Sequence, residues 1–221
     1  MPMVRRSTLP ATLYRRGPEV KTVDLNVNGQ VIDSTGSIAL LNGVAEGTSF
    51  YNRIGRRISL KSVQISGTLN DNTAGTPTND SLYVRMLVLY DRQNNGGTPA
   101  LPDILQDVTA AGTIVTDAYS GINMSNSDRF KVLMDNRVFI PNDNTTNAGQ
   151  NLEQGIAGYL PGTGETNIKR YIKLNGLETN YGTANANAAG CQTGALWLVF
   201  VSAGSNMLQA NLRIRVRYND Q

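Results

Sequence analysis

Basic side chains at regular spacing carry the clearest chemistry in this chain. From Leu212 to Tyr218, apolar residues and arginines alternate without a break. In a β-strand this alternation places Arg213, Arg215 and Arg217 on one face and the apolar side chains on the other. Such a row can bind nucleic acid phosphates; the alternative is a solvated face, or ion pairs with neighbouring acids. The residues expected to contact nucleic acid are Arg5, Arg6, Arg15, Arg16, Lys21, Arg56, Arg57, Lys61, Arg213, Arg215 and Arg217.

Catalytic chemistry has little support in the composition. The chain has no histidine, so it lacks the usual general base, the Ser-His-Asp system and the commonest zinc ligand. Its one cysteine, Cys191, can form no internal disulfide, and we expect it to be a small residue without a reactive role. The carboxylates are scattered singly, and no phosphate-binding glycine loop is present. We predict no enzyme, no catalytic or metal-binding residues and no cofactor. A calcium site built from loop oxygens stays open, because such a site needs no fixed spacing.

The positive charge is concentrated at the N-terminal end. Residues 1–21 contain five basic side chains and one acidic side chain, a net charge of +4, against −1 for residues 22–221. This segment also contains three prolines and little apolar periodicity, so we expect an extended arm that binds a polyanion, nucleic acid above all. A second expected use of the arm is nuclear import. The alternative is that the charge of the arm is incidental and binds nothing. The arm lacks the apolar core of a signal peptide, and no apolar stretch is long enough to insert into a membrane.

The rest of the chain, residues 22–221, is predicted to be one all-β domain. Residues 82–91 are apolar on both faces, which indicates a central strand, and the polar residues 91–99 that follow indicate a turn. Residues 99–107 resemble a short helix with Pro102 in its first turn. Further strands are expected near 22–28, 35–41, 57–69, 129–140 (in two pieces around 135–136), 168–175, 195–201 and 212–218.

The strand at 57–69 contains a change of phase. Ile58 and Leu60 are apolar at even positions, whereas Val63 and Ile65 are apolar at odd positions. A β-bulge at Lys61-Ser62 would let both halves face the core.

Asp91 and Arg92 close the buried strand. We expect them to pair with each other or across a subunit boundary, and we assign both to a subunit interface.

Two segments resemble a known family. Residues 53–62, which open a strand after a basic arm, are similar to the first sandwich strand of coat proteins from small circular single-stranded DNA viruses that encode a replication initiator, geminivirus coat proteins included. The run from Val84 to Arg92, followed by residues 96–99, is similar to the matching strand of those proteins and of the satellite tobacco necrosis virus coat protein. The chain lacks the Cys/His cluster of typical geminivirus coat proteins.

The resemblance implies a structural protein with an eight-stranded jelly roll. It implies a T=1 icosahedral shell of sixty copies that encloses single-stranded nucleic acid, with DNA favoured over RNA. The virion is then the expected location, and assembly is expected in the host nucleus. A host-cell receptor is a further expected partner. The alternative is a β-sandwich module that binds a carbohydrate or receptor through Tyr119, Tyr159 or Tyr181.

Overall fold

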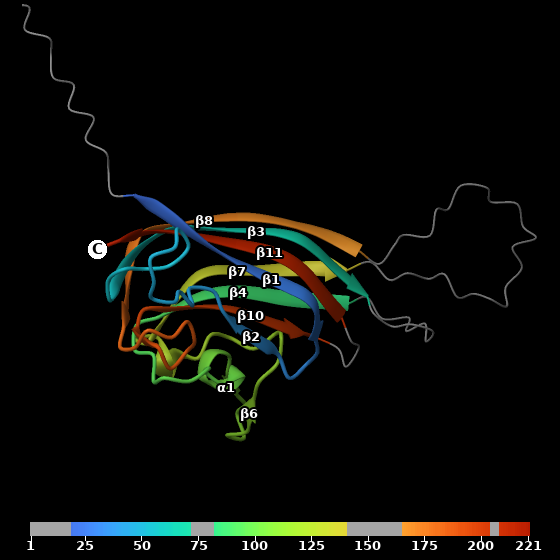
Figure 1. The fold of residues 1–221 in the computed structure, drawn as a ribbon. Helices are drawn as coiled ribbons and strands as arrows, with labels where there is room; N and C mark the ends of the chain where they lie inside the picture. Colours follow the sequence, from blue (N-terminus) through green and yellow to red (C-terminus); the bar gives the residue numbers. More distant parts are fainter. Residues whose placement is uncertain (1–18, 72–81, 141–164, 204–207) are drawn as a thin grey trace, which may run out of the picture.

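The protein is a sandwich of two antiparallel β-sheets, seen here in a computed structural model that describes residues 19–71, 82–140, 165–203 and 208–221 (Figure 1). The first sheet has the order β1-β11-β3-β8-β9, and the second has the order β2-β10-β4-β7. The first sheet contains β1 (Val20–Ile32), β11 (Leu208–Asp220), β3 (Arg57–Asp71), β8 (Glu165–Tyr181) and the short β9 (Cys191–Thr193). The second sheet contains β2 (Ser37–Leu40), β10 (Ala195–Ser202), β4 (Leu82–Asp91) and β7 (Phe130–Ile140).

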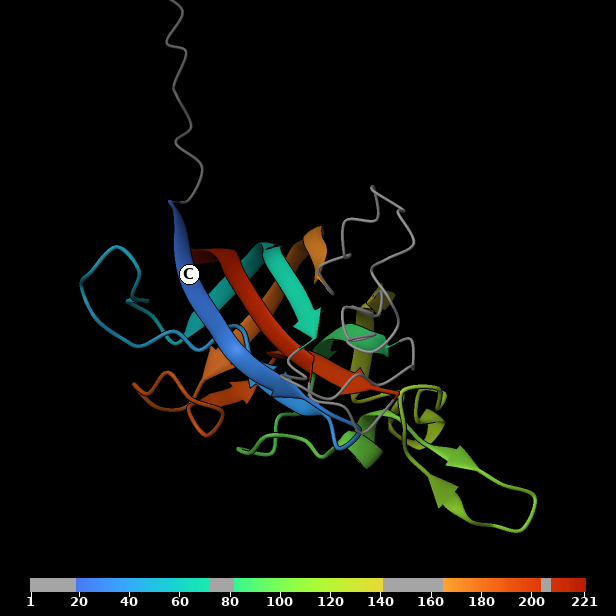
Figure 2. The ribbon, with the colours of Figure 1, turned by 90° about the vertical axis from the view of Figure 1, so that its right-hand side faces the viewer.

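This strand order is that of a jelly roll. Along the chain, β1 and β2 lie in different sheets, as do β3 and β4, β7 and β8, and β10 and β11, so the connections wrap around the sandwich. Two sheets wound in this way, each with four main strands and the first with the short β9 added at its edge, confirm the predicted fold. Apart from the main strands, the segment between β4 and β7 holds α1 (Leu101–Ile104), η1 (Met124–Asn126) and a hairpin of β5 (Asp107–Val108) and β6 (Ile114–Val115) that projects from the body (Figure 2).

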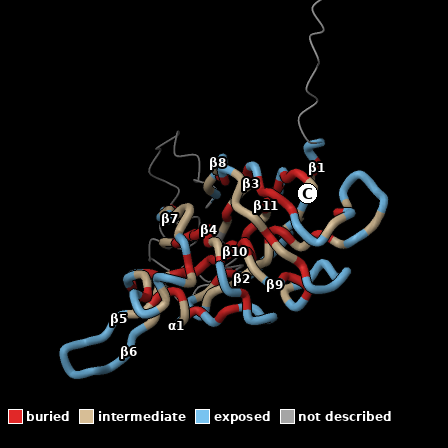
Figure 3. The backbone as a smooth tube through the Cα atoms, turned by 90° about the vertical axis from the view of Figure 1, so that its left-hand side faces the viewer, coloured by how far each residue is buried: buried red, intermediate tan, exposed pale blue. Residues whose placement is uncertain are grey.

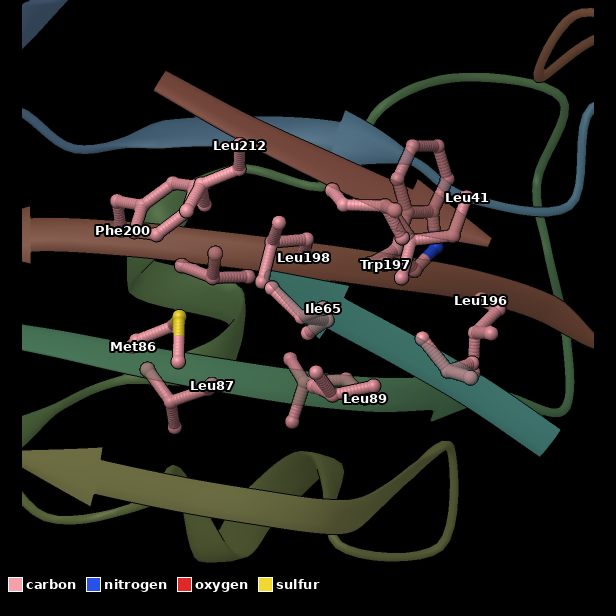
Figure 4. Packing of buried hydrophobic residues seen from close by; sticks show 14 of the residues in the cluster. Leu41, Ile65, Met86, Leu87, Leu89, Leu196, Trp197, Leu198, Phe200 and Leu212 are labelled. Carbon is pink, nitrogen blue, oxygen red and sulfur yellow. The ribbon is translucent and has the colours of Figure 1, made fainter. Parts of the chain in front are cut away.

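The core lies between the sheets, where the strands are most buried (Figure 3). Side chains from β3, β4, β10 and β11 meet there, among them Ile65, Met86 and Leu198 (Figure 4). Both β4 and β10 are buried on both faces, as their continuous apolar sequences predicted. The outer face of β4 is covered by the segment that follows α1: the Arg85 guanidinium donates to the carbonyls of Ala118 and Ser120, and the Tyr83 ring stacks on Tyr119 with centroids 5.3 Å apart.

The predicted bulge is confirmed. Lys61 has no partner on β11, because Arg217 pairs with Ser62 and Tyr218 pairs with Leu60. As a result, Leu60 and Val63 are both fully buried although they fall on opposite parities, while Lys61 is exposed.

Other elements differ from the expectation in length or continuity. The predicted break at 135–136 is wrong: β7 is one strand whose irregularity against β4 falls at Leu133. The strand expected at 168–175 is longer, since β8 pairs with β3 along most of its length. The predicted helix is shorter, and Pro102 does lie in its first turn, with Ile104 and Leu105 buried against the sheet.

Candidate nucleic-acid-binding surface

The three arginines of β11 lie on the outer face of the first sheet. Arg213, Arg215 and Arg217 are exposed, and the residues between them, Ile214 and Val216, are buried. The strict alternation read from the sequence therefore holds in the structure, because β11 is paired on both sides, by β1 and by β3.

Strand β8 adds two lysines to the same face. Across β3, Arg217 is in register with Ser62 and then with Lys173, while Arg213 is in register with Ser66 and then with Lys169. Both lysines are exposed. We call the surface around five exposed basic side chains the basic face: Lys169, Lys173, Arg213, Arg215 and Arg217.

Sequence reasoning missed the two lysines. Their signal was present, because Ile168, Ile172 and Leu174 alternate with Lys169 and Lys173. Nothing in the sequence showed that β8 pairs with β3 in the register that places them beside the arginines, since that pairing joins distant segments.

The three arginines of β11 differ in their ion pairing. Arg215 holds Asp24 of β1 with two hydrogen bonds, from Nε to Oδ1 at 2.8 Å and from Nη2 to Oδ2 at 2.7 Å. The hydrogen bond from Arg215 lowers the pKa of Asp24, so the pair stays charged at neutral pH. For Arg215 the alternative of an ion pair is thus correct. Arg213 and Arg217 have no acidic partner within the described ranges, so their charge is available to a ligand.

A hollow lies between the strands of this face. It has a volume of about 400 Å³ and is lined by Asp24, Asn26, Gln64, Ser66, Arg213 and Arg215. Its walls offer both hydrogen-bond donors and acceptors, together with the positive charge of Arg213, whereas the charge of Arg215 is paired with Asp24.

The other predicted basic residues lie elsewhere or in altered settings. Arg56 and Lys61 are exposed near the start of β3 but fall outside the rows of the basic face. Arg57 forms an ion pair with Glu178 of β8. Residues Arg5, Arg6, Arg15 and Arg16 lie outside the described residues.

Lys21 belongs to the folded domain, which corrects its assignment to an unfolded arm. Strand β1 begins at Val20, and Lys21 is only 5% exposed. Its ammonium donates to Asp220 Oδ2 and to the Asn52 carbonyl, both at 2.9 Å. Burial acts to raise the pKa of Asp220, but hydrogen bonds from the Ile54 amide and from Lys21 lower it below its ordinary value. Lys21 therefore anchors the start of β1 and is not free to bind phosphates.

Asp91 is also a residue of the subunit interior, and its predicted pairing with Arg92 is wrong. Asp91 is fully buried and receives two hydrogen bonds from Arg129, at 3.0 and 2.8 Å, because Arg129 precedes the strand β7 that pairs with β4. The Arg92 side chain is exposed and its guanidinium donates to the Asp128 carbonyl, at 3.2 Å. An interface role is left to Arg92 alone.

Three features of the described residues bear on other chemistry. Cys191 is buried, and burial raises the pKa of its thiol to about 12, so it is a poor nucleophile. In the part of the chain that the structure describes, no three histidine, cysteine or acidic side chains converge on a point where a metal ion could bind. Within the same residues, no helix has the length and apolar character needed to cross a bilayer.

The strand order defines a class, the jelly-roll β-sandwich, which virus coat proteins share with lectins and cupins. The chain belongs to the geminivirus coat protein/nuclear export factor BR1 family, whose model matches residues 2–221. The resemblance to virus coat proteins is thus confirmed.

Comparison with individual proteins gives relatives of the same kind. The coat protein of Maize white line mosaic Satellite virus is 31% identical over 118 residues, which are 53% of this chain and 50% of that protein. The match thus spans about half the length of that relative. Among solved structures, Desmodium yellow mottle tymovirus is 10% identical, with a TM-score of 0.33 over 92% of this chain and 89% of the other. Because that TM-score is low, the fold assignment rests on the strand order.

Proposed function

We propose that this chain is a capsid protein that assembles into a closed icosahedral shell of sixty copies and encloses a single-stranded genome, with circular DNA favoured over RNA. One observation carries the proposal: a jelly roll whose first sheet has a basic outer face. A sheet of this kind presents fixed positive charge over a broad surface, which suits the repeated phosphates of a long nucleic acid. In this role the protein is structural and acts without catalysis.

The arm and the basic face divide the work of binding. The arm supplies Arg5, Arg6, Arg15 and Arg16, and the face supplies charges on paired strands. Arg56 and Lys61 add charge near the point where the arm joins the sandwich. The virion is the resulting location; assembly in the nucleus and recognition of a host receptor are further parts of the proposal.

The second candidate, a carbohydrate-binding module, loses one of its supporting residues. Of the tyrosines expected to bind sugar, Tyr181 is buried beneath the Arg53 guanidinium, 4.2 Å from the ring centroid, whereas Tyr119 stacks on Tyr83 and is still 62% exposed. Tyr159 lies outside the described residues. Electron microscopy separates the two candidates, because a module would run as a monomer or small oligomer and a capsid protein as closed particles.

The test of genome binding uses matched charge removals. The double variant Arg213→Gln/Arg217→Gln should form particles that protect less nucleic acid from nuclease than wild-type particles do. The control, Lys131→Gln/Arg137→Gln, removes two exposed charges from β7 in the other sheet and should protect a normal amount. Equal loss in both variants would show that only total charge matters. Absence of particles for the wild-type chain over a range of salt and pH would overturn the capsid proposal.

A further inference from the structure

An exposed tyrosine lies between the two lysines of the basic face. Tyr171 of β8 is 58% exposed and shares its side of the strand with Lys169 and Lys173, two residues away in each direction. Side chains two residues apart on a strand are separated by about 7 Å, so an ammonium group flanks the ring on either side. Across the sheet, Tyr171 is in register with Gln64 of β3, and Gln64 with Arg215 of β11.

The protein itself makes no use of this ring within the described residues. Other tyrosines have clear structural partners: the hydroxyl of Tyr90 donates to the Glu178 carbonyl at 2.6 Å, and that of Tyr181 donates to the Asn42 carbonyl at 2.6 Å. Tyr171 has neither a hydrogen bond nor a ring contact in that part of the chain. An aromatic ring left open between two lysines, on a strand paired with β3, is available to a ligand with a flat face.

We propose that Tyr171 is a stacking site for an unpaired nucleobase of the enclosed strand, with Lys169 and Lys173 binding the phosphates on either side. This inference rests on the proposed genome-binding function and gives it a site. Aromatic rings within a positively charged groove are a general means of binding single strands, because every base has a π-face. A duplex would be bound more weakly at this site, since its bases are already stacked and paired.

The neighbouring hollow extends the site. It begins one strand away, where Gln64 and Ser66 of β3 line it together with Asn26 of β1. Adjacent strands are about 4.8 Å apart, so a nucleotide next to the stacked base reaches these polar side chains. Amide and hydroxyl groups both donate and accept hydrogen bonds, so the hollow accepts different bases without selecting one.

The inference changes the expected salt dependence. Binding through the arm alone depends on counterion release and weakens steeply as salt rises. Stacking involves no released counterion, so part of the affinity of wild-type protein for a single strand should persist at high salt.

The experiment compares two oligonucleotides that differ only in their bases. The full-length protein is titrated with fluorescent oligothymidylate and with an abasic chain of the same length and phosphate number. Wild type is expected to bind oligothymidylate about tenfold more tightly than the abasic chain, which corresponds to modest stacking of one base. Tyr171→Ala should lose this preference and bind the two chains alike, and Tyr171→Phe should keep it because the ring remains.

Two further variants serve as controls. Tyr51 is also exposed, at 62%, but lies in the loop before β3, so Tyr51→Ala should bind as wild type does. Tyr14→Ala tests the one tyrosine of the arm. Because Tyr171 is exposed, the thermal unfolding of Tyr171→Ala should match that of wild type, which separates lost stacking from lost folding. Photocrosslinking to an oligonucleotide containing 5-iododeoxyuridine should join the base to Tyr171, as located by mass spectrometry.

Each outcome decides a different point. If Tyr171→Ala keeps the full preference, or if Tyr14→Ala alone removes it, the stacking site is not Tyr171, and the proposed capsid function is unaffected. A wild-type protein that binds both chains equally would overturn stacking but leave phosphate binding in place. Failure of the wild type to bind either chain would overturn the genome-binding function and the stacking site together.

Discussion

At the residue scale, one buried ion pair joins three parts of the chain. Lys21 at the start of β1 meets Asp220 at the end of β11, and Asp220 also accepts the Ile54 amide at 2.7 Å, from the loop before β3. The Asn52 carbonyl accepts the remaining hydrogen bond from Lys21. The entry of the arm into the sandwich is therefore fixed by charge as well as by strand pairing.

Removing one partner of this pair should be costly. Asp220→Asn leaves the Lys21 ammonium buried without a counter-charge, and we expect a loss of about 3 kcal/mol in the free energy of unfolding of the subunit. Denaturant unfolding of unassembled protein measures it. The matched control is Asp24→Asn, which breaks the exposed pair with Arg215 and should leave stability unchanged. Similar losses in the two variants would contradict the anchoring role of Lys21.

The same pair predicts an acid-sensitive step. Because the folded-state pKa of Asp220 is lowered, its stabilising contribution is present above the ordinary carboxyl pKa of 3.8 and is lost as the pH falls through the lowered value. The unfolding free energy of wild type should thus drop more between about pH 5 and pH 2 than that of Asp220→Asn. Parallel pH profiles for the two proteins would show that Asp220 contributes nothing to the acid dependence.

The adjacent residues Asp91 and Arg92 should differ sharply in their consequences. Arg129→Ala leaves Asp91 charged and buried, so it should destabilise the subunit by about 3 kcal/mol or more. Arg92→Ala removes an exposed side chain, so it should leave subunit stability intact while lowering particle yield, as an interface residue would. Circular dichroism and particle counts by microscopy measure the two effects. A normal yield of particles from Arg92→Ala would remove Arg92 from the interface.

At the element scale, local sequence patterns predicted where the strands lie better than they predicted which strands pair with each other. The alternation of β11, the apolar runs of β4 and β10, the bulge at Lys61 and the turn of helix at Pro102 all depend on a few neighbouring residues, and all were found. Pairings between distant segments left no such local pattern. For that reason the sequence did not predict the lysines of β8 beside the arginines, Arg129 as the partner of Asp91, or Lys21 as part of the sheet.

The bulge itself can be tested by deletion. Without Lys61, Leu60 would be followed directly by Ser62, so Leu60 and Val63 would lie two residues apart and face the core in a regular strand, because the side-chain period of a strand is two. Deleting Lys61 should therefore leave the subunit folded with Leu60 and Val63 both buried. Lys61→Ala keeps the bulge and should fold normally. Unfolded or insoluble protein from the deletion would mean that β3 needs the bend that the bulge provides.

At the scale of the whole molecule, the residues that carry the surface charge are not those that hold the fold together. The sandwich is held by apolar packing between its two sheets, and the basic face lies on the outer side of one sheet, away from that core. Residues of the basic face can thus change with little effect on folding. Genome binding and shell formation should accordingly be separable by mutation.

Two truncations of the N-terminal segment should differ in whether they affect only genome binding or also folding. Deleting residues 1–18 removes Arg5, Arg6, Arg15 and Arg16 but leaves β1 whole, so shells should form and enclose less nucleic acid, because the phosphate contacts of these arginines are gone. Deleting residues 1–21 also removes Lys21, which breaks the buried pair with Asp220 and shortens the pairing of β1 with β11. The longer truncation should therefore yield less folded subunit and fewer particles.

Microscopy and the ratio of absorbance at 260 and 280 nm distinguish the two truncated proteins. Equal packaging by the shorter truncation and by wild type would place genome binding on the basic face alone. Normal particles from the longer truncation would show that assembly itself, through contacts between subunits, holds β1 in place without Lys21. The two truncations differ only by residues 19–21, and β1 begins at Val20. These three residues therefore decide whether a truncated chain loses only nucleic acid binding or its folding as well.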